Sequence, residues 1–127
     1  SSGRVASMRV ALLLYADVAA AAQTTRQESE AELQRYAEIT ADMAEAGVLR
    51  GGEALRPAAE GGHIGRDGDE VTGAVHSDPE LSGFYLLECT WEDALSWARR
   101  LPVAHHGRVE VRPLMDLPDA GSSPIQA

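Results

Sequence analysis

The stretch Gly83–Cys89, GFYLLEC, decides the fold that the sequence predicts. Nearly every residue in it is apolar or aromatic, which is typical of a strand that is covered on both faces. Thr90 follows at the position of a helix N-cap, with Asp93 at the third helical position. The next proline, Pro102, ends this helix, so a buried strand leads directly into a helix.

The rest of the chain supplies further elements on both sides of this strand and helix. The sequence predicts a strand at Arg9–Tyr15, a helix from the capping box of Thr25 and Glu28 to Gly47, a strand at Val48–Arg56 with a glycine bulge, a hairpin that turns at Asp67–Gly68, and a last strand at Gly107–Pro113. This order predicts an α+β fold of the ferredoxin-like split βαβ type, with an antiparallel sheet and two helices on one of its faces.

The long helix carries an apolar stripe with a period of 3.6 residues, which we expect to face the core. Its members are Leu33, Tyr36, Ala37, Thr40, Met43, Ala44 and Gly47. The opposite side of the helix is acidic and is expected to face the solvent.

Two helices on one face leave the other face of the sheet bare, although Gly83–Cys89 is apolar on both sides. A symmetric partner is the simplest cover, which predicts a homodimer in which two sheets face each other as a dimeric α+β barrel, with a cavity in each half. Phe84, Glu110 and Arg112 are expected on this second face. They either line a pocket with a few oriented polar groups or, for the charged two, pair at the rim of an interface.

Composition and charge exclude several classes of protein. The 127 residues suit one domain, and a net charge of −9 without any cluster of basic residues argues against partners such as nucleic acid or an anionic membrane surface. The longest apolar run, Val10–Leu14, is far shorter than the roughly 20 residues of a membrane-spanning helix. The single cysteine, Cys89, cannot form an intrachain disulfide, which agrees with a cytoplasmic location.

The two ends of the chain are expected to lie outside the domain. Residues 1–7 contain no apolar segment and are interpreted as a cloning remnant, so that Met8 would be the native start. The domain is expected to span residues 8–115. Residues 116–127 are rich in Pro, Ser and Gly and are expected to form a mobile tail.

Four blocks of the sequence together resemble the YCII-related domain family, in the branch whose members carry an Asp-Gly-Pro-Phe motif. The blocks are MRVALLLYAD (Met8–Asp17), AGVLRGGEALRP (Ala46–Pro57), GFYLLECTWEDALSWARRLP (Gly83–Pro102) and HGRVEVRPLM (His106–Met115). The resemblance implies a ferredoxin-like subunit in a dimeric α+β barrel. It also implies lyase-like or cofactor-independent chemistry with a histidine–aspartate pair. Polyketide cyclases, cofactor-free monooxygenases and muconolactone-type isomerases share this barrel, which is an analogy of fold only.

The motif that marks this branch is degenerate here. Its position reads Thr72-Gly73-Ala74-Val75, so only the glycine is kept, and the loop His76–Ser82 follows before the apolar strand. The role of the motif in relatives is therefore not carried over to these residues. We expect the loop near the mouth of the pocket, where this chain would differ most from its relatives.

His76 and His106 are the candidate catalytic bases, because an imidazole exchanges protons near neutral pH. Asp78 lies two residues after His76 and could orient it, and the alternative is a polar surface turn. His106 lies in a block that resembles the family, whereas its neighbour His105 occupies a more variable position.

Tyr15, Asp17 and Glu53 also lie in blocks that resemble the family. Asp17 is interpreted either as a catalytic carboxylate or as the cap of the segment that follows it. Glu53 follows two glycines and is either aimed into a cavity by a glycine bulge or part of a solvated turn. We expect Tyr15, Glu53, Phe84 and Arg112 to contact the substrate.

Two functions from different classes follow from these residues. The first is a small enzyme with no cofactor and no metal, since the chain has neither CxxC nor HxxxH spacing and no nucleotide-binding glycine motif. It would move a proton on a small aromatic or polyketide-like molecule as a lyase, isomerase or cyclase, in secondary metabolism. A histidine would be oriented by Asp17, Asp78 or Glu53, and Tyr15 or Arg112 would stabilise developing negative charge.

The second is a non-catalytic dimer that binds a metabolite or regulates a partner. A histidine beside a carboxylate in a closed cavity would favour the enzyme.

Overall fold

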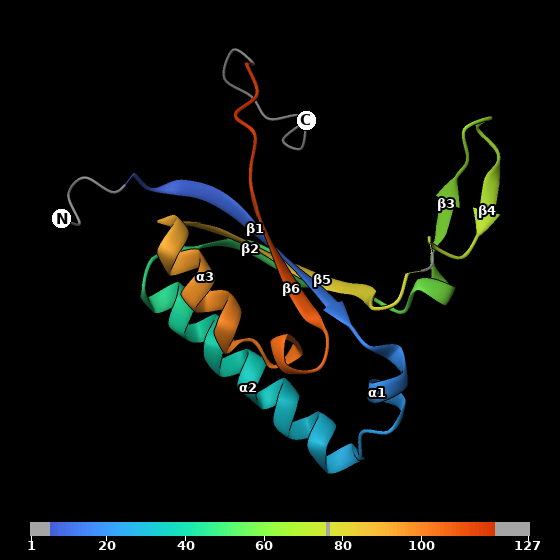
Figure 1. Cartoon of the computed structure of the whole chain (residues 1–127), viewed down its shortest axis with the longest axis horizontal. Helices are drawn as coiled ribbons and strands as arrows, with labels where there is room; N and C mark the ends of the chain where they lie inside the picture. The colour runs from blue at the N-terminus through green and yellow to red at the C-terminus, as the bar shows by residue number, and fades with distance from the viewer. Residues whose placement is uncertain (1–5, 76, 119–127) are drawn as a thin grey trace.

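The structure, a computed structural model, describes residues 6–75 and 77–118 (Figure 1). Its strands are β1 (Met8–Ala16), β2 (Leu49–Ala54), β3 (Gly62–Ile64), β4 (Glu70–Thr72), β5 (Glu80–Cys89) and β6 (Arg108–Pro113). Its helices are α1 (Val18–Ala22), α2 (Arg26–Glu45) and α3 (Trp91–Arg100), with the short 3₁₀ helices η2 (Ala58–Glu60) and η3 (Pro102–His105). The strands and the two long helices lie where the sequence predicts them, except that β5 begins at Glu80, inside the predicted loop His76–Ser82. The short α1 is an addition.

Four of the strands form one antiparallel sheet in the order β2-β5-β1-β6. Counted along the chain, this order is second, third, first, fourth, as in the ferredoxin-like split βαβ fold. Figure 1 shows α2 and α3 together on one face of the sheet, which confirms the predicted α+β architecture. The predicted hairpin is present as β3 and β4, which pair with each other and stand apart from the four-stranded sheet (Figure 1).

The core lies between the helix-covered face of the sheet and the two long helices. Alternate residues of β1 and β5 point to that face, and Val10, Leu12 and Leu87 are completely buried there. Met43 of α2 is completely buried in the same cluster. Each such side chain stabilises the folded state by roughly 1.5–3 kcal/mol when it leaves water. This apolar layer therefore holds the helices on the sheet.

The start of the long helix α2 follows the prediction. Thr25 Oγ1 accepts a hydrogen bond from the Glu28 amide at 3.1 Å, and a Glu28 carboxylate oxygen accepts one from the Thr25 amide at 2.9 Å. These two bonds form a complete capping box. Gly47 follows the last turn with a φ of 77°, a conformation that favours glycine, so both ends of the helix are determined locally.

The predicted buried side of α2 is partly wrong. Met43 is buried, but so is Ile39, which the predicted stripe leaves out, whereas Leu33 is 69% exposed. Ala37 and Ala44 are exposed as well. In Figure 1 the N-terminal half of α2 diverges from the sheet, so its first turns cannot bury a whole apolar side against the strands.

This packing predicts very different costs for truncating two leucines. Leu12→Ala should lower the free energy of unfolding by roughly 2–5 kcal/mol, because Leu12 is completely buried between the sheet and the helices. Leu33→Ala should change it by no more than about 0.5 kcal/mol, because most of the Leu33 side chain is already in water. Urea denaturation followed by circular dichroism measures both values, and equal losses would contradict this placement of the core.

Candidate functional site

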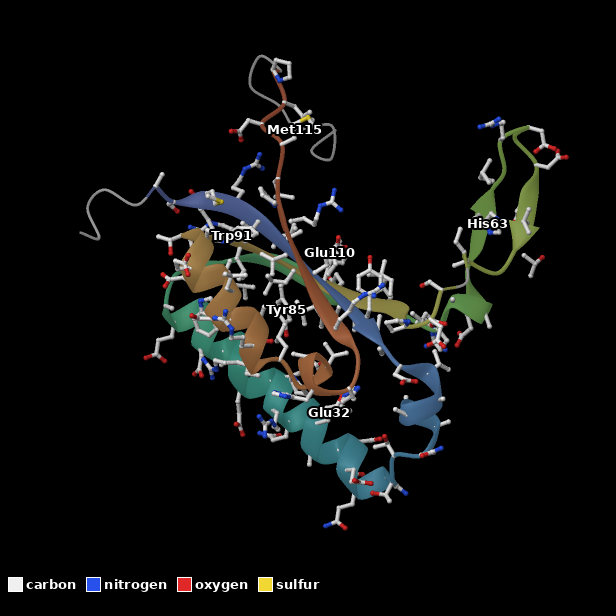
Figure 2. The ribbon with its side chains drawn as sticks, viewed as in Figure 1. Glu32, His63, Tyr85, Trp91, Glu110 and Met115 are labelled. Carbon is white, nitrogen blue, oxygen red and sulfur yellow. The ribbon has the colours of Figure 1, made fainter. Side chains whose placement is uncertain are left out.

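The described residues form a cleft of about 320 Å³ between α2 and the neighbouring parts of β2 and β5. Its lining comes from α2 (Leu33, Tyr36, Thr40) and from the sheet (Leu14, Gly52, Glu53, Ala54, Ser82, Gly83, Phe84, Tyr85). Figure 2 shows Tyr85 in the space between the sheet and the helices. A mostly apolar cleft of this size suits a small organic ligand.

Small residues on the helix-facing side of the sheet create this space. Gly52 and Ala54 alternate on that side of β2, and Gly83 is the register partner of Ala54 on β5. The largest side chain at these three positions is the methyl group of alanine, so the layer under α2 is left unfilled there. Gly52 cannot be replaced without a shift, because a Cβ there would lie 2.8 Å from the carbonyl oxygen of Phe84.

Two hydroxyl groups at the cleft have a defined direction of hydrogen bonding. Thr40 Oγ1 donates to the carbonyl oxygen of Tyr36 at 2.7 Å. Because this bond uses its only proton, the tyrosine is the donor in the 2.8 Å contact between Thr40 Oγ1 and Tyr85 Oη. The Tyr85 oxygen keeps capacity as an acceptor, so a ligand with an O–H or N–H group can donate to it.

Tyr36 is a neutral part of the cleft wall. Its hydroxyl oxygen accepts a hydrogen bond from the Val103 amide at 3.1 Å, which ties η3 to α2. Burial raises the pKa of Tyr36 to about 12; the hydrogen bond from Val103 opposes the rise, while Glu32 and Tyr85 add to it. Tyr36 therefore stays protonated far above neutral pH and does not supply a base.

Of the predicted site residues, Glu53 and Phe84 line the cleft. They are register partners on β2 and β5, so the fold brings them together. Side chains alternate along a strand, so Glu53 and Phe84 lie on the open face of the sheet while Tyr85 faces α2. The two residues therefore belong to the border of the cleft and not to the wall under the helix. Glu53 is exposed on the edge strand and is the single carboxylate in the described lining.

Tyr15 and Arg112 also meet, but on the open face of the sheet and not in the cleft. The Tyr15 hydroxyl donates to Glu110 Oε1 at 3.4 Å, and Arg112 Nη1 lies 3.5 Å from Glu110 Oε2. The guanidinium group of Arg108 lies over the Tyr15 ring, 5.2 Å from its centre. The sequence leaves two interpretations of Arg112, a residue that lines a pocket or a residue that pairs with Glu110. The structure shows the pair.

Asp17 caps a helix. One of its carboxylate oxygens accepts a hydrogen bond from the Ala20 amide at 3.1 Å, at the N-terminus of α1. The residue does not line the cleft. From the sequence, Asp17 is interpreted either as a catalytic carboxylate or as a helix cap, and the structure shows the cap.

The loop before β5 contains the other predicted acid–base pair. His76 lies outside the described residues, so its pairing with Asp78 stays a prediction. Asp78 is exposed, and the neighbouring Ser77 hydroxyl donates to the Pro79 carbonyl oxygen at 2.8 Å. This short turn has the local side-chain to backbone bond that is common in polar loops.

His106 has a carboxylate partner, although not one that the sequence suggests. Its Nε2 atom lies 3.3 Å from Glu32 Oε2, across the contact between η3 and α2 (Figure 2 labels Glu32). About a third of each side chain is exposed (34% and 35%), and neither residue lines the cleft. The carboxylates expected to orient this histidine, Asp17 and Glu53 among them, lie elsewhere.

Sequence reasoning missed two polar residues of the cleft lining, Thr40 and Tyr85. Thr40 falls in the predicted apolar stripe and Tyr85 in the apolar strand, so both are interpreted as packing residues. Their contact joins positions 45 residues apart, which the spacing along one chain does not reveal. The one local feature of the sequence that points to a cleft is the glycine pair Gly51–Gly52. The irregularity predicted for this strand is present, because the register of β2 with β5 shifts between Leu49 and Gly51.

Several kinds of site are absent from the part of the chain that the structure describes. Within residues 6–75 and 77–118, no group of three or more His, Cys, Asp or Glu residues could hold a metal ion. No helix in the same residues has the length and apolarity needed to cross a membrane. Cys89 is buried, and burial raises the pKa of its thiol, so it remains a protonated packing residue.

The fold and the cleft together define a small ferredoxin-like α+β protein with room for a ligand between its long helix and its sheet. The chain belongs to the YCII-related domain family, whose sequence profile matches residues 8–118. This match confirms the resemblance to the family, while membership of the branch with the Asp-Gly-Pro-Phe motif stays a prediction. No curated protein matches the chain significantly.

The raised pKa of Tyr36 predicts a loss of stability at high pH. Tyr36 keeps its proton in the folded protein up to a pKa of about 12, against about 10 for an exposed tyrosine. Its contribution to stability is therefore complete below about pH 10 and is lost as the pH rises through about 12. Tyr36→Phe removes the ionisable group, so its free energy of unfolding should fall less steeply over this range. Urea denaturation at several pH values measures this, and parallel curves for the two proteins would contradict it.

Proposed function

We propose that the protein binds a small, largely apolar molecule, of the size of a substituted aromatic ring, in the cleft between α2 and the sheet. The observation that carries the proposal is a space of about 320 Å³ at the edge of the core, where Gly52 and Gly83 have no side chain. Apolar pockets with a few polar groups are the usual sites of small ligands. Leu14, Tyr36 and Tyr85 offer methyl groups and rings to a flat molecule.

The polar groups of the cleft favour one kind of ligand. The Tyr85 oxygen is an acceptor, because its proton is used by Thr40. Glu53, at the border of the cleft, is also an acceptor and carries negative charge in a chain whose net charge is −9. A neutral ligand with hydroxyl groups, such as a phenol or a phenolic polyketide, therefore fits better than an aromatic acid.

A catalytic role is the second candidate function, and the position of Glu53 is the observation that favours it. A carboxylate at the border of an apolar cleft can accept a proton from an acidic O–H or C–H group of the ligand. The reaction would be that of a lyase, isomerase or cyclase, a class of chemistry that suits secondary metabolism and needs no cofactor. Glu53 would take the role that the sequence analysis gives to a histidine, because none of the described histidines lines the cleft (His63, His105, His106).

We also propose that a second copy of the chain covers the open face of the sheet. Leu13, Phe84 and Leu86 lie on this face and are only partly buried. A contiguous apolar face on a soluble domain is typical of an interface. Arg112 and Glu110, beside these residues, form an ion pair with each other within one chain. The pair can therefore lie at the rim of an interface without needing a charged partner from the second copy. A twofold axis would then place the two sheets face to face.

Ligand binding can be tested with a set of small phenols and the matching aromatic acids, using calorimetry and ligand-observed NMR. We expect the phenols to bind and the acids to bind more weakly, because both polar groups at the cleft are acceptors. Tyr85→Phe should raise the Kd of a phenol by about two- to tenfold. Tyr15→Phe removes a tyrosine hydroxyl from the open face and is the matched control, which should leave the Kd unchanged.

Glu53→Gln separates binding from catalysis in the same experiment. If a bound phenol is transformed, this variant should keep its Kd and lose turnover by about 100-fold or more. Turnover that is lost in His76→Ala or His106→Ala but kept in Glu53→Gln would assign the base to a histidine instead. Binding without turnover would leave the non-catalytic function, and no binding by any phenol would show that the cleft proposal is wrong.

The dimer can be tested by sedimentation velocity. The wild-type protein should have twice the mass of the 13.5 kDa chain. Leu86→Glu puts a charge in the middle of the open face and should yield a folded monomer, as judged by circular dichroism. Val71→Glu, on the exposed hairpin strand β4, is the matched control and should remain a dimer. A monomeric wild-type protein would contradict the proposal.

A further inference from the structure

A second groove, lined mainly by basic side chains, lies on the side of α2 that does not border the cleft. It has a volume of about 370 Å³ and is formed by α2, the end of α3 and η3. Its lining consists of Arg35, Glu38, Ile39, Arg99, Arg100 and His105. Ile39 is 4% exposed and forms part of the buried core, so the charged residues stand around an apolar base.

Two arginines of this groove are without an acidic partner among the residues that the structure describes. Most of the described arginines form an ion pair, and Arg108 lies over the ring of Tyr15. Arg35, Arg66 and Arg99 do neither, within the described residues. In a chain with 20 acidic and 11 basic residues, acidic partners are plentiful. It is therefore notable that Arg35 and Arg99, from two different helices, face one groove.

The other two basic groups of the groove differ in how far they are fixed, since only the Arg100 side chain has partners among the described residues. Arg100 Nη2 lies 2.6 Å from Asp42 Oδ2, and the Arg100 guanidinium group lies 5.0 Å from the centre of the Trp97 ring. His105 ends η3, which is tied to α2 by the hydrogen bond of the Val103 amide. Of the four basic side chains, Arg100 is therefore already paired, whereas Arg35 and Arg99 have no acidic partner among the described residues.

Helix stability explains only part of this arrangement. Arg99 and Arg100 lie in the last turn of α3, where cations stabilise the negative end of the macrodipole. Arg35 lies in the middle of α2, where this effect has ended. Positive charges that converge from two helices also repel each other. A bound anion would attract each of these groups and so offset their repulsion.

We propose that this groove binds a small oxyanion, the phosphate or carboxylate group of a metabolite, through Arg35, Arg99 and His105. Guanidinium groups match the oxygen pairs of phosphate and carboxylate in two parallel hydrogen bonds. Glu38 is the acidic residue in the described lining and lies one turn from Arg35 on α2. Its charge opposes the anion, so removing it has the opposite effect to removing an arginine.

The test titrates inorganic phosphate and, separately, malonate into the full chain, with sodium chloride added to keep the ionic strength constant. Amide NMR shifts should change and saturate around the groove. Arg35→Gln and Arg99→Gln should each raise the Kd by about tenfold, and Glu38→Gln should lower it. Arg66→Gln removes an arginine from the hairpin turn and is the matched control, which should not change the Kd. The probe that binds more tightly identifies phosphate or carboxylate as the group that the groove selects.

Three results would overturn the proposal. One is that neither probe saturates, and another is that sodium chloride alone produces the same shifts. The third is that Arg66→Gln weakens binding as much as Arg35→Gln does, which would mean that only the overall charge matters.

All four variants are at exposed positions, so melting temperatures without ligand should confirm that they fold. We expect Glu38→Gln to bind the anion more tightly, and a misfolded variant would not show such a gain of affinity. The outcome is independent of the cleft and of the dimer.

Discussion

The packing of Leu12, Leu87 and Met43 between the central strands and α2 is the contact on which the rest of the structure depends. All three side chains are completely buried, so they set the distance between the helix and the sheet. Beyond this layer, Gly52 and Gly83 present no side chain to α2. The helix cannot move down to fill the gap, because it is rigid and is already held by the buried layer. The cleft is therefore the direct consequence of a well-packed core that ends at glycines.

This origin of the cleft also determines which chemistry it offers. The histidine–carboxylate pair of His106 and Glu32 lies at the surface, because burying a charge is costly unless it is paired. The groups that remain in the cleft are hydroxyls, and Thr40 and Tyr85 satisfy part of each other's hydrogen bonding. Such a site selects its ligand by shape and by one or two hydrogen bonds. Proton transfer is possible only at its border, where Glu53 lies.

The fold could be predicted from the sequence because its signals are local. The capping box of α2, the turn of the hairpin and the apolar strand β5 are each read within a few residues, and the topology follows from their order. The cleft could not be predicted in this way, because Gly52 and Gly83 share a face only in one register of β2 and β5. That register shifts once along β2, and a slip of one residue reverses the face of every side chain after it. The exposure of Leu33 likewise depends on where α2 leaves the sheet.

The two proposed sites share α2, since Arg35 borders the groove and the next residue, Tyr36, borders the cleft. Two sites on one helix are coupled only if a ligand at one changes the free energy of binding at the other. A movement of the whole helix is a poor route for coupling, because Met43 is locked in the core. The hydrogen bond from the Val103 amide to the Tyr36 hydroxyl is a better one, since His105 lies two residues further along the same 3₁₀ helix. An anion that draws His105 toward Arg35 would strain or strengthen this bond and so reposition a wall of the cleft. If that bond does not respond, the groove and the cleft act independently, even though they lie on opposite sides of the same helix turn.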